Sequence, residues 1–106
     1  MKYMLLITSE PDAPLPEKIG DIEEWLASVE GIRLHGQRLQ NASTATCVRA
    51  RDGKPVVTDG PFAETKEQIC GYDVIDCADL DQAIDIAARH PVAAWGTIEI
   101  RPFWAD

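Results

Sequence analysis

A ten-residue polar loop, residues 59 to 68, holds the densest group of side chains in the chain that could do chemistry. Its sequence is Asp-Gly-Pro-Phe-Ala-Glu-Thr-Lys-Glu-Gln, and it lies between two strand-like runs. Carboxylates beside a lysine are suited to proton transfer and to anion binding, because a cation favours the ionised carboxylate and attracts an anionic substrate. We therefore place the candidate site in this loop.

Asp59 has two open interpretations. Its carboxylate either caps the Gly60-Pro61 turn through backbone N–H groups, or acts as a general acid or base. The two roles are compatible, since a carboxylate held by a tight turn can also be a tuned base. Lys66 would tune Asp59 or neutralise a carboxylate substrate, and Phe62 is interpreted as an anchor for the loop.

The remaining polar residues also have two interpretations each. Glu64 and Glu67 either form a polar cluster over a pocket or lie on a solvated turn. His35 is either a surface or helix-end residue or a general base. His90 is expected to cap a helix C-terminus, where a cation suits the helix dipole.

Two pairs of charged residues each share a strand face: Arg49 with Arg51, and Glu99 with Arg101. If the chain forms a dimer, as inferred below, these residues either form salt bridges at the rim of the dimer interface or recognise an anion between the two subunits. The aromatic residues near the C-terminus either pack at an interface or wall a ligand pocket; they are Trp95, Phe103 and Trp104.

Composition limits the function classes. A chain of 106 residues is one domain, residues 1 to 106, and its net charge of −8 disfavours nucleic acid and anionic membranes as partners. The apolar run near Met1 is too short for a signal peptide, so we expect a cytoplasmic protein. Neither its two histidines nor its three cysteines show metal-ligand spacing, so no metal or other cofactor is expected.

The elements follow from apolar periodicity. Strands are predicted at residues 2 to 8, 44 to 51, 56 to 58, 70 to 76 and 96 to 101. Asp52-Gly53 predicts a hairpin turn. Helices are predicted from Glu17 to Gly31 and from Leu80 to Arg89, the second with Asp79 as N-cap and Gln82 completing a capping box.

This order predicts an α+β fold, a ferredoxin-like split βαβ with an antiparallel sheet and the middle hairpin as one lobe. Two helices cover only one face of such a sheet, yet residues 3 to 7 are apolar on both faces. We therefore expect a homodimer that packs sheet on sheet, a dimeric α/β barrel with an enclosed space between the sheets.

The loop of residues 59 to 68 resembles the hallmark of the DGPF branch of the YCII-related family. The opening residues 1 to 7, the stretch from Thr44 to Pro55, Gly71-Tyr72 and residues 99 to 102 are also similar to the family pattern. The resemblance implies the dimeric α/β-barrel superfamily. It also implies two functions, a small-molecule enzyme or a regulatory module, since many branch members are encoded beside extracytoplasmic-function sigma factors.

The chain departs from the family pattern at three places. The first helix lacks the histidine of the proposed His-Asp pair of the wider family, Asp73 replaces a common aromatic residue, and Gln37 replaces a common glutamate. Asp73 predicts a more polar cavity wall. The candidate catalytic residues are Asp59, Lys66 and His35. The candidate substrate-binding residues are Arg49, Phe62, Glu64, Glu67, Tyr72, Asp73 and Arg101.

Two hypotheses lead from these residues. One is an enzyme without a cofactor, in which Asp59 moves a proton while Lys66 or Arg49 holds a small anionic substrate. The other is a ligand-sensing or protein-binding regulator that uses the same pocket or the loop as its contact surface. The net charge of −8 favours a basic protein as the partner of such a regulator.

Overall fold

Six strands and two α-helices make up the fold in the computed structural model, which describes residues 1–10, 20–60 and 67–105. In chain order they are β1 (Lys2–Ser9), α1 (Ile22–Ser28), β2 (Arg33–Arg38), β3 (Thr46–Arg51), β4 (Lys54–Asp59), β5 (Gln68–Asp76), α2 (Leu80–Ala88) and β6 (Thr97–Pro102). Two short 3-10 turns are η1 (Ala42–Thr44) and η2 (Pro91–Ala94).

The main sheet has the strand order β2-β5-β1-β6, and every neighbouring pair is antiparallel. Strands β1 and β2 thus flank β5 and are joined through α1, which is the split βαβ plan. The predicted ferredoxin-like α+β fold is confirmed. Strands β3 and β4 form a second, two-stranded sheet of their own, as expected of a separate hairpin lobe.

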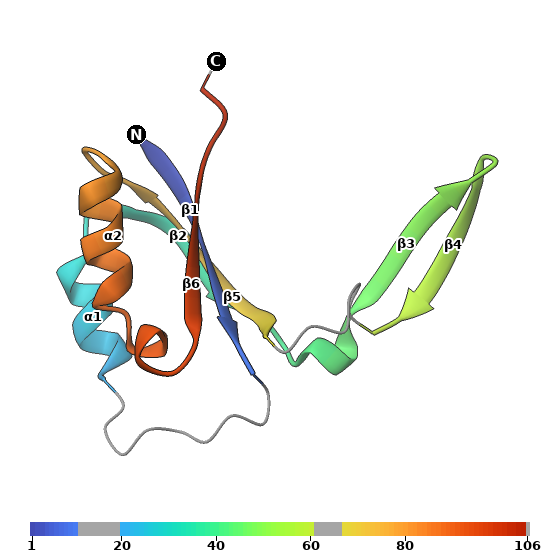
Figure 1. The fold of residues 1–106 in the computed structure, drawn as a ribbon, viewed down its shortest axis with the longest axis horizontal. Helices are drawn as coiled ribbons and strands as arrows, with labels where there is room; N and C mark the ends of the chain where they lie inside the picture. Colours follow the sequence, from blue (N-terminus) through green and yellow to red (C-terminus); the bar gives the residue numbers. More distant parts are fainter. Residues whose placement is uncertain (11–19, 61–66, 106) are drawn as a thin grey trace.

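Strand β1 separates two environments. Tyr3, Leu5 and Ile7 are buried against the helices, while the alternate residues Met4 and Leu6 are only half-buried. Both helices lie on one side of the sheet (Figure 1). The other side, which we call the helix-free face, therefore has apolar side chains and no described helix over it.

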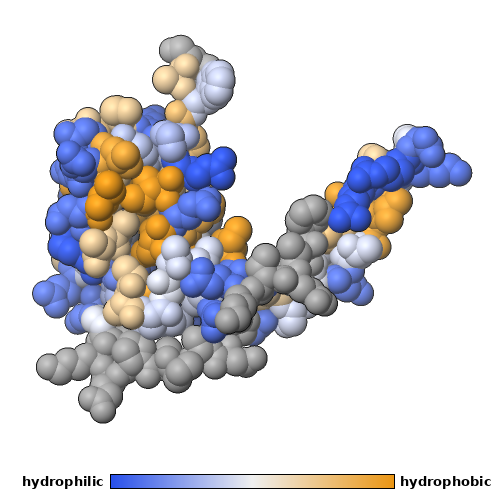
Figure 2. All heavy atoms as spheres, viewed as in Figure 1, coloured by the Kyte–Doolittle hydropathy of each residue, from blue (hydrophilic) through white to orange (hydrophobic). Residues whose placement is uncertain are grey.

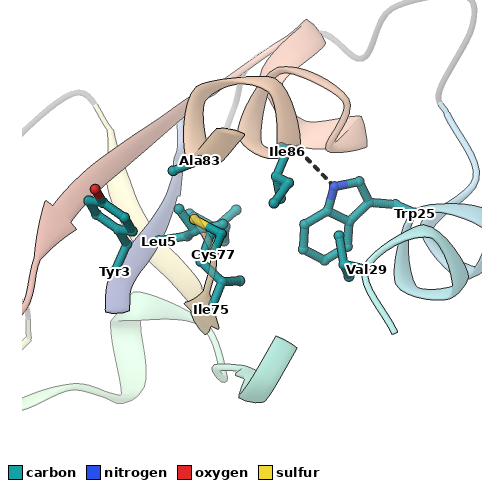
Figure 3. Close-up of a cluster of buried hydrophobic side chains, with 9 residues drawn as sticks. Tyr3, Leu5, Trp25, Val29, Ile75, Cys77, Ala83 and Ile86 are labelled. Atoms are coloured by element: carbon teal, nitrogen blue, oxygen red, sulfur yellow. Dashed lines mark hydrogen bonds between the residues drawn. The ribbon is translucent and has the colours of Figure 1, made fainter. Parts of the chain in front are cut away.

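The core lies between the sheet and the two helices (Figure 3). Trp25 of α1 reaches α2, where its indole Nε1 donates a 2.9 Å hydrogen bond to the carbonyl oxygen of Ile86. Leu5, Val29 and Ile75 are completely buried beside this contact. The hydrogen bond allows the indole, which carries a polar N–H, to be buried at little cost.

Local capping sets the helix bounds. The predicted N-cap of α2 is confirmed, since the Asp79 carboxylate accepts the N–H of Gln82 at 2.9 Å and the Gln82 side chain accepts the N–H of Ala78 at 2.7 Å. Helix α1 begins later than predicted, at Ile22, because Asp21 is its N-cap. It also ends earlier, at Ser28.

Among the described residues, no helix combines the length and apolar character that a membrane crossing requires.

Strand β2 was not predicted. His35 lies in this strand and is exposed, so it is a surface residue as predicted, but not a helix-end residue. The sequence Arg-Leu-His-Gly-Gln-Arg has one large apolar residue, so it shows no strand periodicity. Its backbone becomes a strand because it pairs with β5, placing His35 opposite Val74 and Gly36 opposite Asp73. Tertiary pairing rather than local preference determines this element.

The β3–β4 hairpin projects from the main sheet (Figure 1), and its apolar side chains are open to solvent (Figure 2). Its turn has positive φ at both Asp52 (52°) and Gly53 (75°), the conformation predicted for an Asp-Gly hairpin. The radius of gyration, 15.8 Å, exceeds the about 13 Å expected of a compact chain of this length. The hairpin therefore adds little to the core of its own chain.

Candidate functional site

A cavity of about 740 Å³ opens between the start of α1, strands β2 and β5, and η2. It is continuous with the core, since Ile7 and Trp25 belong to both. Its wall is mostly apolar and includes a small number of polar groups, which is the usual make-up of a small-molecule site. The polar side chains that matter for its chemistry are Arg33, Arg38, Asp73, His90 and Trp95.

An ion pair crosses the floor of the cavity between neighbouring strands. The Arg33 Nε donates to the Asp73 Oδ1 at 2.6 Å, and the Asp73 side chain is 8% exposed against 29% for Arg33. A carboxylate so deeply buried needs a cationic partner, because desolvation would otherwise be costly. Asp73 therefore makes the wall of this cavity polar, and its predicted role in substrate binding stays a prediction.

Gly36 provides the space for this ion pair. It lies directly opposite Asp73 in the β2–β5 ladder. A Cβ at this position would overlap the Asp73 carboxylate and the Arg33 guanidinium. Glycine is therefore required here, because the ion pair lies directly against the backbone of β2 where a side chain would otherwise be.

His90 is the second buried polar residue of the site. It is 6% exposed and its ring packs edge-on against Trp25 with centroids 4.6 Å apart. Its Nδ1 accepts the N–H of Val92 at 3.0 Å, so His90 caps η2. The expected role as a cation at the end of α2 is wrong, because Nδ1 acts here as an acceptor and burial lowers the pKa of His90, while Asp73 raises it by a smaller amount.

The tautomer of His90 follows from this hydrogen bond. A neutral imidazole that accepts at Nδ1 carries its proton on Nε2. The nitrogen of His90 that remains for a ligand is thus a donor. In this state His90 can hold an acceptor atom but cannot take up a proton from a substrate.

Trp95 lines the same cavity, and its indole Nε1 is buried without a hydrogen-bond partner among the described residues. Such groups are rare in folded proteins and call for a physical explanation. Trp95 is thus an aromatic residue near the C-terminus that lines a cavity, and its role in binding a ligand stays a prediction. Trp104, by contrast, is 92% exposed.

The loop that carried most of the sequence prediction lies only partly within the described residues. Pro61, Phe62, Glu64 and Lys66 fall outside them. Asp59 ends β4 in an exposed position on the hairpin, and the next residue, Gly60, donates its N–H to the Ala45 carbonyl at 2.8 Å. Asp59 and His35 therefore belong to different sheets of the chain and are not brought together.

Tyr72 and His35 form a contact that the sequence did not predict. The Tyr72 hydroxyl lies 2.7 Å from the His35 Nδ1, and both residues are in neighbouring strands of the main sheet. His35 thus has a hydrogen-bond partner, although His35 does not line the cavity. Tyr72 is also among the residues that line the cavity.

Three other predicted residues lie away from the cavity. Glu67 accepts hydrogen bonds from the hydroxyls of Thr97 at 2.9 Å and Thr8 at 3.4 Å, and so ties the start of β5 to β1 and β6. Arg101 makes an exposed 3.4 Å ion pair with Glu99. Arg49 is exposed on the hairpin. Their roles in substrate binding stay predictions.

Sequence reasoning missed Arg33 and the contribution of His90 to the cavity. One signal was present: Asp73 interrupts an otherwise apolar run, and a carboxylate at a buried strand position requires a basic partner. Arg33 could not be identified as that partner, because its strand had no periodic pattern. Within the described residues, no three His, Cys, Asp or Glu side chains converge as a metal site would require.

Comparison with known proteins gives two matches. The model of the YCII-related domain family matches residues 1–105, essentially the whole chain. A curated relative from Rhizobium meliloti (strain 1021), "Uncharacterized protein R00369", is 46% identical over 67 residues, which is 61% of this chain and 54% of the relative. The chain thus spans about half the length of this curated relative.

Proposed function

Since this chain belongs to the YCII-related domain family, and the matched relative has no assigned activity, we propose a function from the geometry of the cavity: it binds a small molecule. The observation that carries the proposal is the pair of a half-buried Arg33 and a buried Asp73 in the wall of a largely apolar cavity. A buried ion pair is a weak source of stability, since two well-packed apolar residues would often serve the fold as well. Binding of a ligand would explain why the ion pair is present.

Binding fits the cavity better than base catalysis does. The neutral His90 presents a donor, and the Asp73 Oδ1 is already occupied by the Arg33 Nε. The predicted catalytic residue Asp59 lies on the hairpin, in a different sheet. A ligand-sensing module is therefore our first functional candidate. A cytoplasmic setting is part of the proposal, because all three cysteines are free thiols, which a reducing compartment maintains.

The proposed binding unit is a homodimer. The helix-free face carries the half-buried side chains of Met4, Leu6, Tyr72 and Val74, and the hairpin leaves Val48 and Val57 exposed at 65% and 59%. Two uncovered apolar surfaces on one small chain are suited to burial against a second copy. The cavity itself lies on the opposite, helix-covered side of the sheet from the space that such a dimer would enclose.

Ligand screening by calorimetry, with small acids, amides and alcohols, tests the binding proposal. Leu26→Trp fills the cavity from α1, while Leu80→Trp places the same side chain on the exposed surface of α2, outside the cavity wall. We expect the first variant to weaken binding by at least about 10-fold, because it occupies the ligand's space, and the second to leave it unchanged. Equal ligand affinity in both variants would show that the cavity is not the site.

A further inference from the structure

The charge of the cavity wall differs in sign from that of the whole chain. The chain has 18 acidic and 10 basic residues. Among the described residues that line the cavity, the charged ones are Arg33, Arg38 and Asp73. With His90 neutral, two cations and one anion give the lining a charge of +1 in a protein of net charge −8, and the excess cation is Arg38, which is exposed at the end of β2. A local positive field in a low-dielectric cavity attracts anions.

The hydrogen-bonding groups of the cavity wall also favour an anion, because most of them are donors. Arg33 uses its Nε for Asp73, and its two outer nitrogens have no partner among the described residues. His90 offers Nε2–H, since Nδ1 is taken by Val92. Trp95 holds a further unpartnered N–H nearby in the wall. Donors thus outnumber acceptors, and Asp73 provides one remaining carboxylate oxygen.

The rest of the wall fits a hydrocarbon. Ile22, Leu26 and Val92 line the cavity beside the ring of Trp25. At about 740 Å³ the cavity is within the range of small-molecule sites, so a compact aliphatic or aromatic body fits beside the polar groups. A small polyanion does not suit this wall, because most of its surface would meet apolar side chains.

We propose that the cavity selects a small monocarboxylate with an apolar body. The carboxylate is received by the outer nitrogens of Arg33 with the His90 Nε2–H as a second donor, and the body packs against the α1 residues and Val92. This inference rests on the proposed function and adds the ligand class. It names Arg33 as an anion contact, whereas the sequence predicted Lys66 or Arg49, of which Lys66 lies outside the described residues.

The test is a calorimetric comparison of acids with their primary amides, which match them in shape and lack the charge. We use hexanoate with hexanamide and phenylacetate with phenylacetamide. We expect each acid to bind at least about 10-fold more tightly than its amide, because a charge-assisted hydrogen bond to a guanidinium is roughly twice as strong as a neutral one.

Substitutions in the ion pair make the test specific. Asp73→Asn keeps the shape but removes the competing negative charge, so the affinity for each acid rises several-fold while that for each amide stays the same. The double variant Arg33→Met/Asp73→Leu removes both charges and leaves no buried ion unpaired. It should lose the preference for the acid. Arg89→Met, at an exposed arginine that pairs with Asp85 at 3.2 Å and does not line the cavity, is the matched control and should keep it.

The outcomes separate the two proposals. Amides that bind as tightly as acids, with binding still abolished by Leu26→Trp, overturn the carboxylate preference and leave the small-molecule function in place. A preference for acids that survives in the double variant also overturns it. Absence of saturable binding for every acid, amide and alcohol overturns both. Thermal melts of the Asp73→Asn protein establish that it is folded.

Discussion

The buried histidine of the cavity makes the stability of the protein depend on pH. Burial lowers the pKa of His90 below its ordinary value of 6.5, which the unfolded chain retains. The unfolded chain therefore binds the proton more readily in the interval below 6.5. This contribution to the free energy of unfolding is fully present above that value and is lost as the pH falls toward the folded-state pKa.

We expect the free energy of unfolding, measured with urea, to fall between about pH 7 and about pH 5 partly through this residue. His90→Asn should flatten that part of the profile, because asparagine can still accept the Val92 N–H as an N-cap but does not titrate. His35→Asn, at the exposed histidine, serves as the control and keeps the wild-type slope. A profile for His90→Asn that is superimposable on the wild type would contradict this account.

The residues of the site could be predicted only in part. Asp73 was singled out because it replaces a residue that is commonly aromatic in the family pattern. Arg33 was not, because its role depends on a strand that forms through pairing with β5. The density of charge between Asp59 and Gln68 drew attention to the loop. Yet Asp59 is exposed, and Glu67 holds strand ends together through Thr8 and Thr97.

Among the elements, those with strong periodicity were predicted well. In β6 the alternation of apolar and polar residues puts Ile98 and Ile100 on one face, and both pack against the core. The existence of α2 and its N-cap were predicted in the same way. The predicted stripe was only partly right: Leu80 and Ile84, which the helical spacing placed toward the core, are about half exposed, while Ala83, Ile86 and Ala87 are buried. Strand β2 has no such pattern, and the start of α1 depends on which of several acidic residues accepts the first free N–H. Such choices are decided by the folded chain as a whole.

The N-cap of α2 offers a stability test at this scale. Asp79→Ala removes the acceptor for the Gln82 N–H, and we expect a loss of about 1 kcal/mol in the free energy of unfolding. Asp81→Ala, two residues after the N-cap, removes a carboxylate of the first turn that is not the N-cap. It should lower the free energy of unfolding by only a few tenths of a kcal/mol. Urea titration measures both. Equal losses would mean that charge at the helix end, rather than the cap, stabilises α2.

At the scale of the whole molecule, two apolar surfaces are left uncovered by the described residues. The two described helices lie on one side of the sheet, and the hairpin extends away from the core (Figure 1). A stable association typically buries about 800 Å² on each subunit, and the helix-free face and the hairpin each offer apolar side chains for it. These two surfaces support the homodimer that we propose.

Sedimentation of two charge variants tests this assembly. Leu6→Glu places a carboxylate on the helix-free face, and we expect association to weaken by at least about 100-fold, because a charge would be buried without a partner. Ile84→Glu introduces the same charge on the exposed side of α2 and should leave the dimer intact. A wild-type protein that sediments as a monomer at micromolar concentration would refute the dimer proposal.

The most direct test of the cavity as a ligand site is an NMR titration that follows the three tryptophan indole N–H resonances. Trp25 and Trp95 line the cavity, while Trp104 is 92% exposed. With the tightest-binding acid of the calorimetric series, we predict a saturable shift of the Trp95 resonance, a smaller one for Trp25, and none for Trp104. Saturable binding that moves Trp104 alone, or that moves no indole resonance, would contradict the account.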